Sequence, residues 1–193
     1  ATAAPTLIRH LMDKSASVRM ASVHALVRVA PASREAVDAL AETLTREGKE
    51  HSQLRAAAAE GLGEIGVAAQ PAVLALMRCL MSEERRLRRA AIQSLGKLGP
   101  LALVNLRSAL LEADPALRGG AAEAIEIMGP EGAEAAPELI VVFESGKDGA
   151  KRVAVDALVA IGKPAVKPLI KGCKHKNPTV RLWCARALGR MGP

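Results

Sequence analysis

The sequence is poor in aromatic side chains: its 193 residues include one Trp, one Phe and no Tyr. Half of the residues are nevertheless hydrophobic, so a buried interior has to be filled by Ala, Leu, Ile and Val. This composition argues against a disordered chain and favours closely packed helices. The length suits one domain with a substantial interior.

Cysteine is also scarce, and its spacing fits neither a disulfide framework nor a zinc site. Cys79, Cys173 and Cys184 are an odd number without a CxxC pair, and we interpret them as small buried apolar groups in a reducing compartment. The longest apolar stretch, LIVVF at 139–143, is far too short for a membrane span, and no charged-then-apolar leader opens the sequence. We therefore predict a cytoplasmic protein without a membrane partner.

Motifs of catalysis are missing as well. The sequence has no GxSxG, HExxH, Walker or Cys–His arrangement, and its four histidines stand alone. Gly61, Gly63 and Gly66 form a GxGxxG string, but they close a predicted helix instead of joining a strand to a helix start, so a nucleotide site is disfavoured. We predict no enzyme activity, no cofactor and no metal ligand.

Internal repetition dominates the sequence. Similar phrases end six successive segments, which we place at residues 1–31, 32–67, 68–100, 101–130, 131–163 and 164–193. The phrases share an apolar reference position, occupied in turn by Leu26, Leu62, Leu95, Ile125, Leu158 and Leu188. A cation stands seven residues before each of these positions: Arg19, Arg55, Arg88, Arg118, Lys151 and Arg181. The chain is therefore predicted to be one repeat domain.

Each segment has the pattern of two helices. Asp114-Pro115 and Asn177-Pro178 place a capping side chain before a proline at the start of the second helix, and Ser15 occupies the same column. Glycine follows the last apolar residue of five second helices, where a left-handed backbone can close a helix. The second repeat is three residues longer, and we place the insertion in its inter-helix loop, REGKEHSQ.

Small residues recur four positions before the reference residue: Ser22, Ala58, Ala91, Ala121, Ala154 and Cys184. Small side chains allow helices to approach closely while Leu and Ile fill the layer between repeats. No single repeat could bury its apolar face alone, but stacked repeats bury a continuous interior. The predicted fold class is all-α, an α-solenoid of six helix pairs.

The apolar-Arg step, the alanines and the closing A-L-G-x-I-G-P phrase, preceded by A-x-P-x-L-x-x-x-L, resemble HEAT repeats, specifically the short bacterial variety also found in phycobilin lyase subunits. The resemblance covers all six repeats. It implies a right-handed, armadillo-like superhelix that acts as a scaffold, with the second helices lining a concave surface that grips other macromolecules. A role similar to that of bilin lyase components rests on the resemblance alone.

The recurring cation is interpreted as a structural ladder rather than a ligand-binding row. We expect it to pair with acidic residues of the preceding turn, among them Asp13, Glu83, Glu112, Asp114 and Glu144. Each pair would contribute at most about 1 kcal/mol if exposed.

Positive charge is concentrated at one end of the sequence. Residues 146–193 carry a net charge of +9, whereas residues 1–145 carry −2. A basic patch is predicted from lysines that recur along one helix and its following turn: Lys163, Lys167, Lys171, Lys174 and Lys176. Such a patch can meet an acidic protein or neutralise phosphates of a nucleic acid, or it can be simply a solvated face. Missing aromatic platforms count against nucleic acid.

Helical spacing also defines the residues expected on the concave face. This concave stripe consists of Met20, His24, Arg28, Glu60, Glu64, Arg89, Gln93, Lys97, Glu123, Ile127, Arg152, Asp156, Leu182, Arg186 and Arg190. The stripe is mixed in sign and changes from repeat to repeat, which suits a protein-binding groove better than a uniform phosphate track. We therefore predict a protein partner, which can present an acidic surface. The alternative partner is a nucleic acid.

Trp183 occupies a column that otherwise holds Ala, Gly or Val. Either the last repeat repacks as a cap around the ring, or the ring faces a further repeat or subunit. Self-association through the terminal repeats is the hypothesis that follows from the second alternative.

Overall fold

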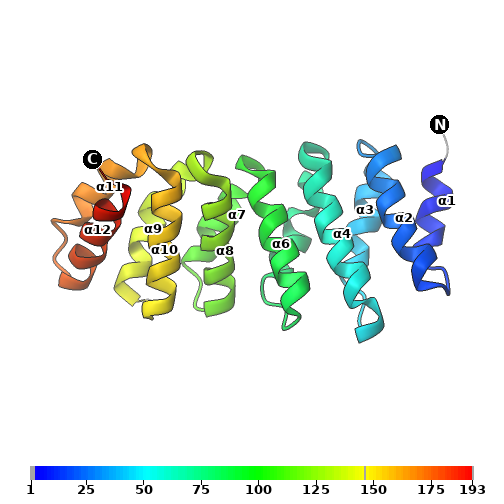
Figure 1. Cartoon of the computed structure of the whole chain (residues 1–193), viewed down its shortest axis with the longest axis horizontal. Coiled ribbons are helices and arrows are strands. Elements are labelled where there is room, and N and C mark those ends of the chain that lie inside the picture. Colours follow the sequence, from blue (N-terminus) through cyan, green and yellow to red (C-terminus); the bar gives the residue numbers. More distant parts are fainter. Residues whose placement is uncertain (1–2, 146, 193) are drawn as a thin grey trace. The chain divides into compact units, whose positions relative to one another are not determined.

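The computed structural model describes residues 3–145 and 147–192, without the side chains of Lys49, Ser145 and Asp148. In this part of the chain helices are joined by turns, and no strand occurs (Figure 1). The chain divides into two compact units, Ala1–Leu101 and Ala102–Pro193. This division falls next to the predicted boundary between the third and fourth repeats.

The first unit contains three helix pairs. Its α-helices are α1 (Ala3–His10), α2 (Ala16–Val29), α3 (Arg34–Thr43), α4 (Ser52–Ile65), α5 (Val73–Cys79) and α6 (Arg85–Leu98), and two 3₁₀ helices are η1 (Lys49–His51) and η2 (Gly66–Ala72). The second helix of the middle pair, α4, packs against α2 on one side and α6 on the other, while α3 packs against α1 and α5. First and second helices thus form two separate layers.

The second unit repeats this arrangement. It contains α7 (Pro100–Leu110), which begins just before the division, α8 (Pro115–Met128), η3 (Gly129–Ala135), α9 (Ala136–Ser145), α10 (Asp148–Ile161), α11 (Lys163–Gly172) and α12 (Pro178–Met191). Here α10 packs against both α8 and α12, and α9 packs against α11. Both units therefore confirm the predicted all-α class and the stacked helix pairs of an α-solenoid.

The six apolar reference residues, from Leu26 to Leu188, lie at the centre of the two units. The first five are fully buried, and the last, Leu188, is half-buried. Fully burying one such side chain contributes roughly 2 kcal/mol. The small column is buried too, from Ser22 at 3% exposure to Cys184 at 0%. The structure thus shows the predicted division: large residues fill the layer between repeats, and small residues allow a neighbouring helix to approach closely.

Helix ends follow the predicted chemistry with one difference. Asp114 Oδ1 accepts hydrogen bonds from the backbone N–H groups of Ala116 and Leu117, at 2.8 and 2.9 Å, and Asn177 caps α12 in the same way. Ser15 takes the N-cap position of α2, but its side chain makes no capping bond. Instead, the backbone N–H of Ser15 donates to Asp13 Oδ1 at 2.7 Å, and this bond stabilises the turn before α2.

Glycines close five second helices at positive φ. Their φ angles lie between 58° and 76°, with ψ between −130° and −173°, at Gly66, Gly99, Gly129, Gly162 and Gly192. This region is closed to residues with a Cβ. The positive φ was expected, but the ψ values show an extended turn instead of a left-handed helical one.

The expected acidic partners of the recurring cation are wrong for four of the arginines. Arg19, Arg118 and Arg181 donate through Nη1 to the carbonyl six residues earlier, at 2.8, 3.1 and 2.8 Å, and Arg88 contacts the carbonyl of Ser82 in the same way. Those carbonyls end the first helix or its turn, where backbone acceptors lack helical partners. The column therefore ties the two helices of a repeat together through the backbone.

Arg55, in the lengthened second repeat, differs from this rule. The insertion increases its distance along the chain from the end of α3, and its Nε donates to the carbonyl of Leu44 at 3.0 Å. Its Nη1 meets Glu84 of the next repeat at 2.9 Å, which is the one carboxylate pairing that the structure records for these arginines.

Candidate functional site

The concave-stripe residues all lie on second helices, and nearly all are exposed. Met20 and Asp156 are half-buried, whereas the other members face solvent. The structure groups only some of them: one set lines a groove between α2 and α4, and another lines a groove between α10 and α12. The other members lie outside both grooves: Met20, Arg89, Gln93, Lys97, Glu123, Ile127, Asp156 and Leu182.

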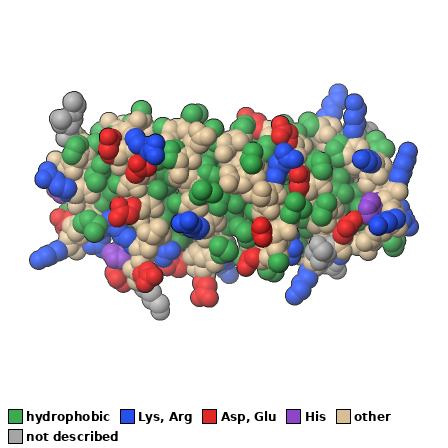
Figure 2. Space-filling view, turned by 180° about the vertical axis from the view of Figure 1, so that it is seen from behind, with side chains coloured by type: hydrophobic (Ala, Val, Ile, Leu, Met, Phe, Trp, Pro, Cys, Tyr) green, Lys and Arg blue, Asp and Glu red, His purple; other side chains and the backbone are tan. Residues whose placement is uncertain are grey.

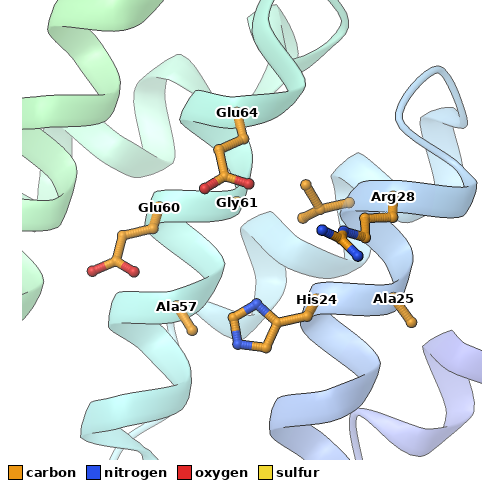
Figure 3. A pocket seen from close by; sticks show the side chains of 8 residues that line it. His24, Ala25, Arg28, Ala57, Glu60, Gly61 and Glu64 are labelled. Carbon is orange, nitrogen blue, oxygen red and sulfur yellow. The ribbon is translucent and has the colours of Figure 1, made fainter.

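The first groove has a volume of about 480 Å³ and mixed charge. His24 and Arg28 project from α2 toward α4, and Glu64 stands across from Arg28 (Figure 3). The carboxylate of Glu60 points away from α2, so only the inner part of this side chain lines the groove (Figure 3). We call this site the mixed-charge groove.

Small residues set the spacing of the helices around this groove. A Cβ added to Gly61 would lie 2.6 Å from Val27 Cγ2, so a larger residue there would have to displace the Val27 side chain. On the other side of α4, Ser94 Oγ of α6 donates to the carbonyl of Ala59 at 2.7 Å in a fully buried contact. The GxGxxG string therefore serves helix packing: Gly61 and Gly63 are buried within α4 and Gly66 ends it.

The second groove, of about 490 Å³, is strongly basic. Arg152 and Val155 line it from α10, and Trp183, Arg186 and Arg190 line it from α12. We call it the arginine groove.

Two of its arginines are held by neighbours. The guanidinium of Arg186 lies over the ring of Trp183, 4.8 Å from its centroid, and Arg190 Nη1 lies 2.5 Å from Asp156 Oδ1. Cation–π stacking and ion pairing both restrict the rotamers of a long side chain. The groove therefore presents guanidinium groups in defined positions.

Trp183 is buried, with 7% of its surface exposed. Its ring stacks on Phe143 of α9, with centroids 6.1 Å apart and planes inclined by 25°. The ring therefore packs against α9 of the preceding repeat. The sequence marks Trp183 as unusual but does not predict its place on the wall of a groove, because its position in the repeat does not fix the direction of the ring.

The basic patch is separate from both grooves. Its five lysines are exposed on α11 and the turn after it, and none forms an ion pair with a residue that the structure describes. Figure 2, seen from the side opposite to Figure 1, shows blue side chains projecting from the right-hand end, where α11 lies. Lys163 and Lys167 line a further groove of about 890 Å³ together with Val159, Val166 and Met191.

One cation on the first helices of the second unit, Arg107, is paired. Arg107 of α7 donates to Glu138 of α9 at 2.8 and 3.1 Å and contacts Glu134 at 3.2 Å. Glu138 raises the pKa of Arg107 through this bond. The pairing joins α7 to α9, and the repeat pattern of the sequence did not mark its three residues, Arg107, Glu134 and Glu138.

Acidic residues border the arginine groove on the side of α8. Partial burial raises the pKa of the Glu126 carboxyl, and the nearby charges of Asp156 and Glu123 raise it further. Arg190 opposes this effect. The face of the second unit therefore changes from acidic at α8 to basic at α12.

The described residues offer neither a cluster of metal ligands nor a reactive buried thiol. Across residues 3–145 and 147–192, no three His, Cys, Asp or Glu side chains gather as a metal site would require. Burial raises the pKa of Cys184 to about 12, so this thiol stays protonated. Cys79 is buried as expected, whereas Cys173 is half-buried and departs from the expected burial.

The segment Ser52–Cys79 is long and apolar enough, at a mean hydropathy of 1.2, to be compared with a membrane span. It is not one straight α-helix, because Gly66 interrupts it at φ 70°. Its two α-helical parts have 14 and 7 residues, and each is too short to cross a hydrocarbon core.

Comparisons with known proteins agree with the repeat architecture. The profile of the family described as HEAT repeats matches residues 44–126 and 136–193, and that described as HEAT repeat matches residues 4–33. No curated protein matches the sequence.

Among solved structures, the complex of CpcE and CpcF of phycocyanin lyase from Nostoc sp. PCC7120 is similar, with a TM-score of 0.53, 23% identity, and coverage of 100% of this chain and 78% of that one. A computationally designed armadillo repeat protein for modular peptide recognition gives a TM-score of 0.46 at 18% identity, over 96% of this chain and 98% of that one. An engineered protein gives 0.49 at 17%, over 100% and 99%. The first of these likenesses supports the helical-repeat fold.

Proposed function

The chain belongs to the HEAT-repeat family, and from that premise we propose that it is a non-enzymatic scaffold that binds another protein through its second helices. The observation that carries the proposal is the pair of open grooves between neighbouring second helices, with small or apolar floors and charged, exposed walls. Protein-binding sites combine such apolar floors with polar rims.

The charges that line the mixed-charge groove differ from the Arg107 cluster in a way that favours this assignment. Arg107 and its glutamate partners neutralise one another on the first helices. On the second helices, His24, Arg28 and Glu64 line a groove without an ion pair among these described side chains. Unpaired charges that differ from groove to groove can discriminate between partners. The complex of two chains in the similar phycocyanin lyase structure is consistent with binding of a protein partner.

Site-specific photo-crosslinking tests the proposal. A benzophenone amino acid placed at exposed Gln93 of α6 samples the second-helix face, and the same probe at Leu74 of α5, 61% exposed, samples the first-helix face as a control. In an extract of the cells that make the protein, we expect a discrete crosslinked partner from position 93 and none from position 74. Equal capture from both positions, or capture from position 74 alone, would contradict the proposal.

Nucleic-acid binding is the second candidate, and the five exposed, unpaired lysines of the basic patch favour it. Phosphate contacts predict affinity for random duplex DNA that falls steeply with salt. Charge reversal at Lys163, Lys167 and Lys171 would then abolish DNA binding. If the same reversal leaves capture of both DNA and protein unchanged, the basic patch has no role in binding.

A role similar to that of bilin lyase components has the likeness of fold as its sole support. Bound pigment after co-expression with a bilin, or turnover, would be required to establish it.

A further inference from the structure

The arginine groove differs from the mixed-charge groove in the sign of its charge. Arg152, Arg186 and Arg190 line it, and Asp156 is the one described carboxylate that pairs with them. Arg152 makes no hydrogen bond or ion pair with any residue in the described ranges. The groove therefore keeps a positive excess that its own unit does not neutralise.

The positions of these groups suit carboxylates. A guanidinium presents a planar fork that binds a carboxylate through two parallel hydrogen bonds. Trp183 holds Arg186 by stacking, and Asp156 holds Arg190 while leaving 55% of that side chain exposed. Part of the entropy cost of ordering these side chains is therefore met before a ligand arrives.

The groove also has an apolar wall. Val155 and Trp183 line the groove together with the three arginines, and the volume of about 490 Å³ lies within the usual range of ligand sites. Exposed Leu182, one turn before Arg186, extends the apolar surface along α12. A protein segment can use both the apolar wall and the charges, whereas a free anion uses the charges alone.

Acidic neighbours limit how far a negatively charged ligand can extend. Glu123 and Glu126 on α8 lie near Asp156 on α10: burial raises the pKa of Glu126, and the charges of Asp156 and Glu123 raise it further. A phosphodiester backbone that continued from α12 across α10 toward α8 would meet this repulsion. A short acidic segment that ends at α10, where it reaches Arg152, would avoid it.

We propose that the arginine groove binds a short acidic segment of a partner protein, with its carboxylates paired to Arg152, Arg186 and Arg190. The inference rests on the proposed function, because it assumes that the second helices meet a protein. It adds the place of contact and the chemistry of the bound segment.

Trp183 provides a direct reporter, because it is the one tryptophan of the chain and lines the groove. The probe is a twelve-residue peptide of alternating Glu and Gly, and the control peptide carries Gln in place of Glu. We expect the Glu peptide to change the Trp183 emission in a saturable manner at low salt, and the Gln peptide to leave it unchanged. Absence of a saturable change with the Glu peptide would overturn the inference.

Matched variants locate the binding. Arg152→Gln combined with Arg186→Gln removes two charges within the groove, and Lys171→Gln combined with Lys174→Gln removes two charges outside it. We expect the first pair to weaken binding of a fluorescein-labelled Glu peptide about tenfold and the second pair less than twofold. Circular dichroism shows whether each variant retains its helices.

The remaining outcomes separate this inference from the proposed function. Equal losses in both double variants would overturn the inference, since binding would then follow net charge alone. Tighter binding of a twelve-nucleotide oligothymidylate than of the peptide, with the same dependence on Arg152 and Arg186, would assign the groove to nucleic acid and overturn it as well. None of these results affects crosslinking from position 93, which lies in the other unit and tests the proposed function by itself.

Discussion

The contact between α4 and α6 gives a sharp test of the packing on which the second-helix layer depends. A Cβ added to Gly63 would lie 2.6 Å from Ser94 Oγ and 2.8 Å from both Cα and Cβ of Ser94. Since Ser94 Cα belongs to the backbone, a rotamer change cannot relieve the contact. The two helices would have to separate, and such overpacking costs roughly 1–3 kcal/mol.

Gly63→Ala also has a favourable effect, because alanine is about 1 kcal/mol better than glycine inside a helix. We therefore expect a net destabilisation of about 1 kcal/mol. Gly119, inside α8, is the matched control, since a Cβ there would meet no atom within 4 Å. Gly119→Ala gains the higher helix propensity of alanine without a steric cost, and it should stabilise the protein by about 1 kcal/mol.

The two substitutions are chemically identical, so the difference of about 2 kcal/mol between them reports the α4–α6 contact alone. For a chain of this size it corresponds to a difference of about 4–8 °C in melting temperature, measured by circular dichroism. If Gly63→Ala raised the melting temperature as much as Gly119→Ala, the close approach of α4 to α6 would be refuted.

Three further predictions concern other parts of the chain. Because burial and neighbouring acids raise the pKa of Glu126, its charge costs stability at neutral pH, and Glu126→Gln should stabilise the protein by about 0.3 kcal/mol at pH 7. Urea denaturation should show this gain vanishing below about pH 4, where the carboxyl is protonated in both folded and unfolded chains. With iodoacetamide at pH 8, mass spectrometry should find half-buried Cys173 modified before buried Cys184, whose pKa is about 12; the reverse order would contradict the described burial. Arg88→Met removes a bond to a turn carbonyl and should lower the melting temperature by about 2–4 °C, whereas exposed Arg89→Met should leave it unchanged.

The recurring arginines have a structural role, although their charge could also have suited ligand binding. At five positions the guanidinium contacts a backbone carbonyl, so these cations belong to the helix pair itself. The charges left for recognition are those of the second-helix face and the basic patch. This division reduces the candidate binding residues to positions that vary among the repeats.

Much of the fold could be predicted from the sequence because it depends on contacts that recur. The reference column, the small column, the caps at Asp114 and Asn177 and the helix-closing glycines follow from spacing within one repeat. Local hydrogen bonding and helical periodicity fix these features whatever the neighbouring repeat contains. Exposure of the concave stripe followed from the same periodicity.

Only the tertiary structure decided which of those exposed residues meet. Helix spacing depends on pairs such as Gly61 with Val27 and Gly63 with Ser94, which come from different repeats. The direction of the Trp183 ring depends on Phe143, forty residues earlier, and creates the wall of the arginine groove. A periodic sequence specifies the repeating unit because its forces are local, whereas a binding groove arises between units, from side chains that no single repeat contains.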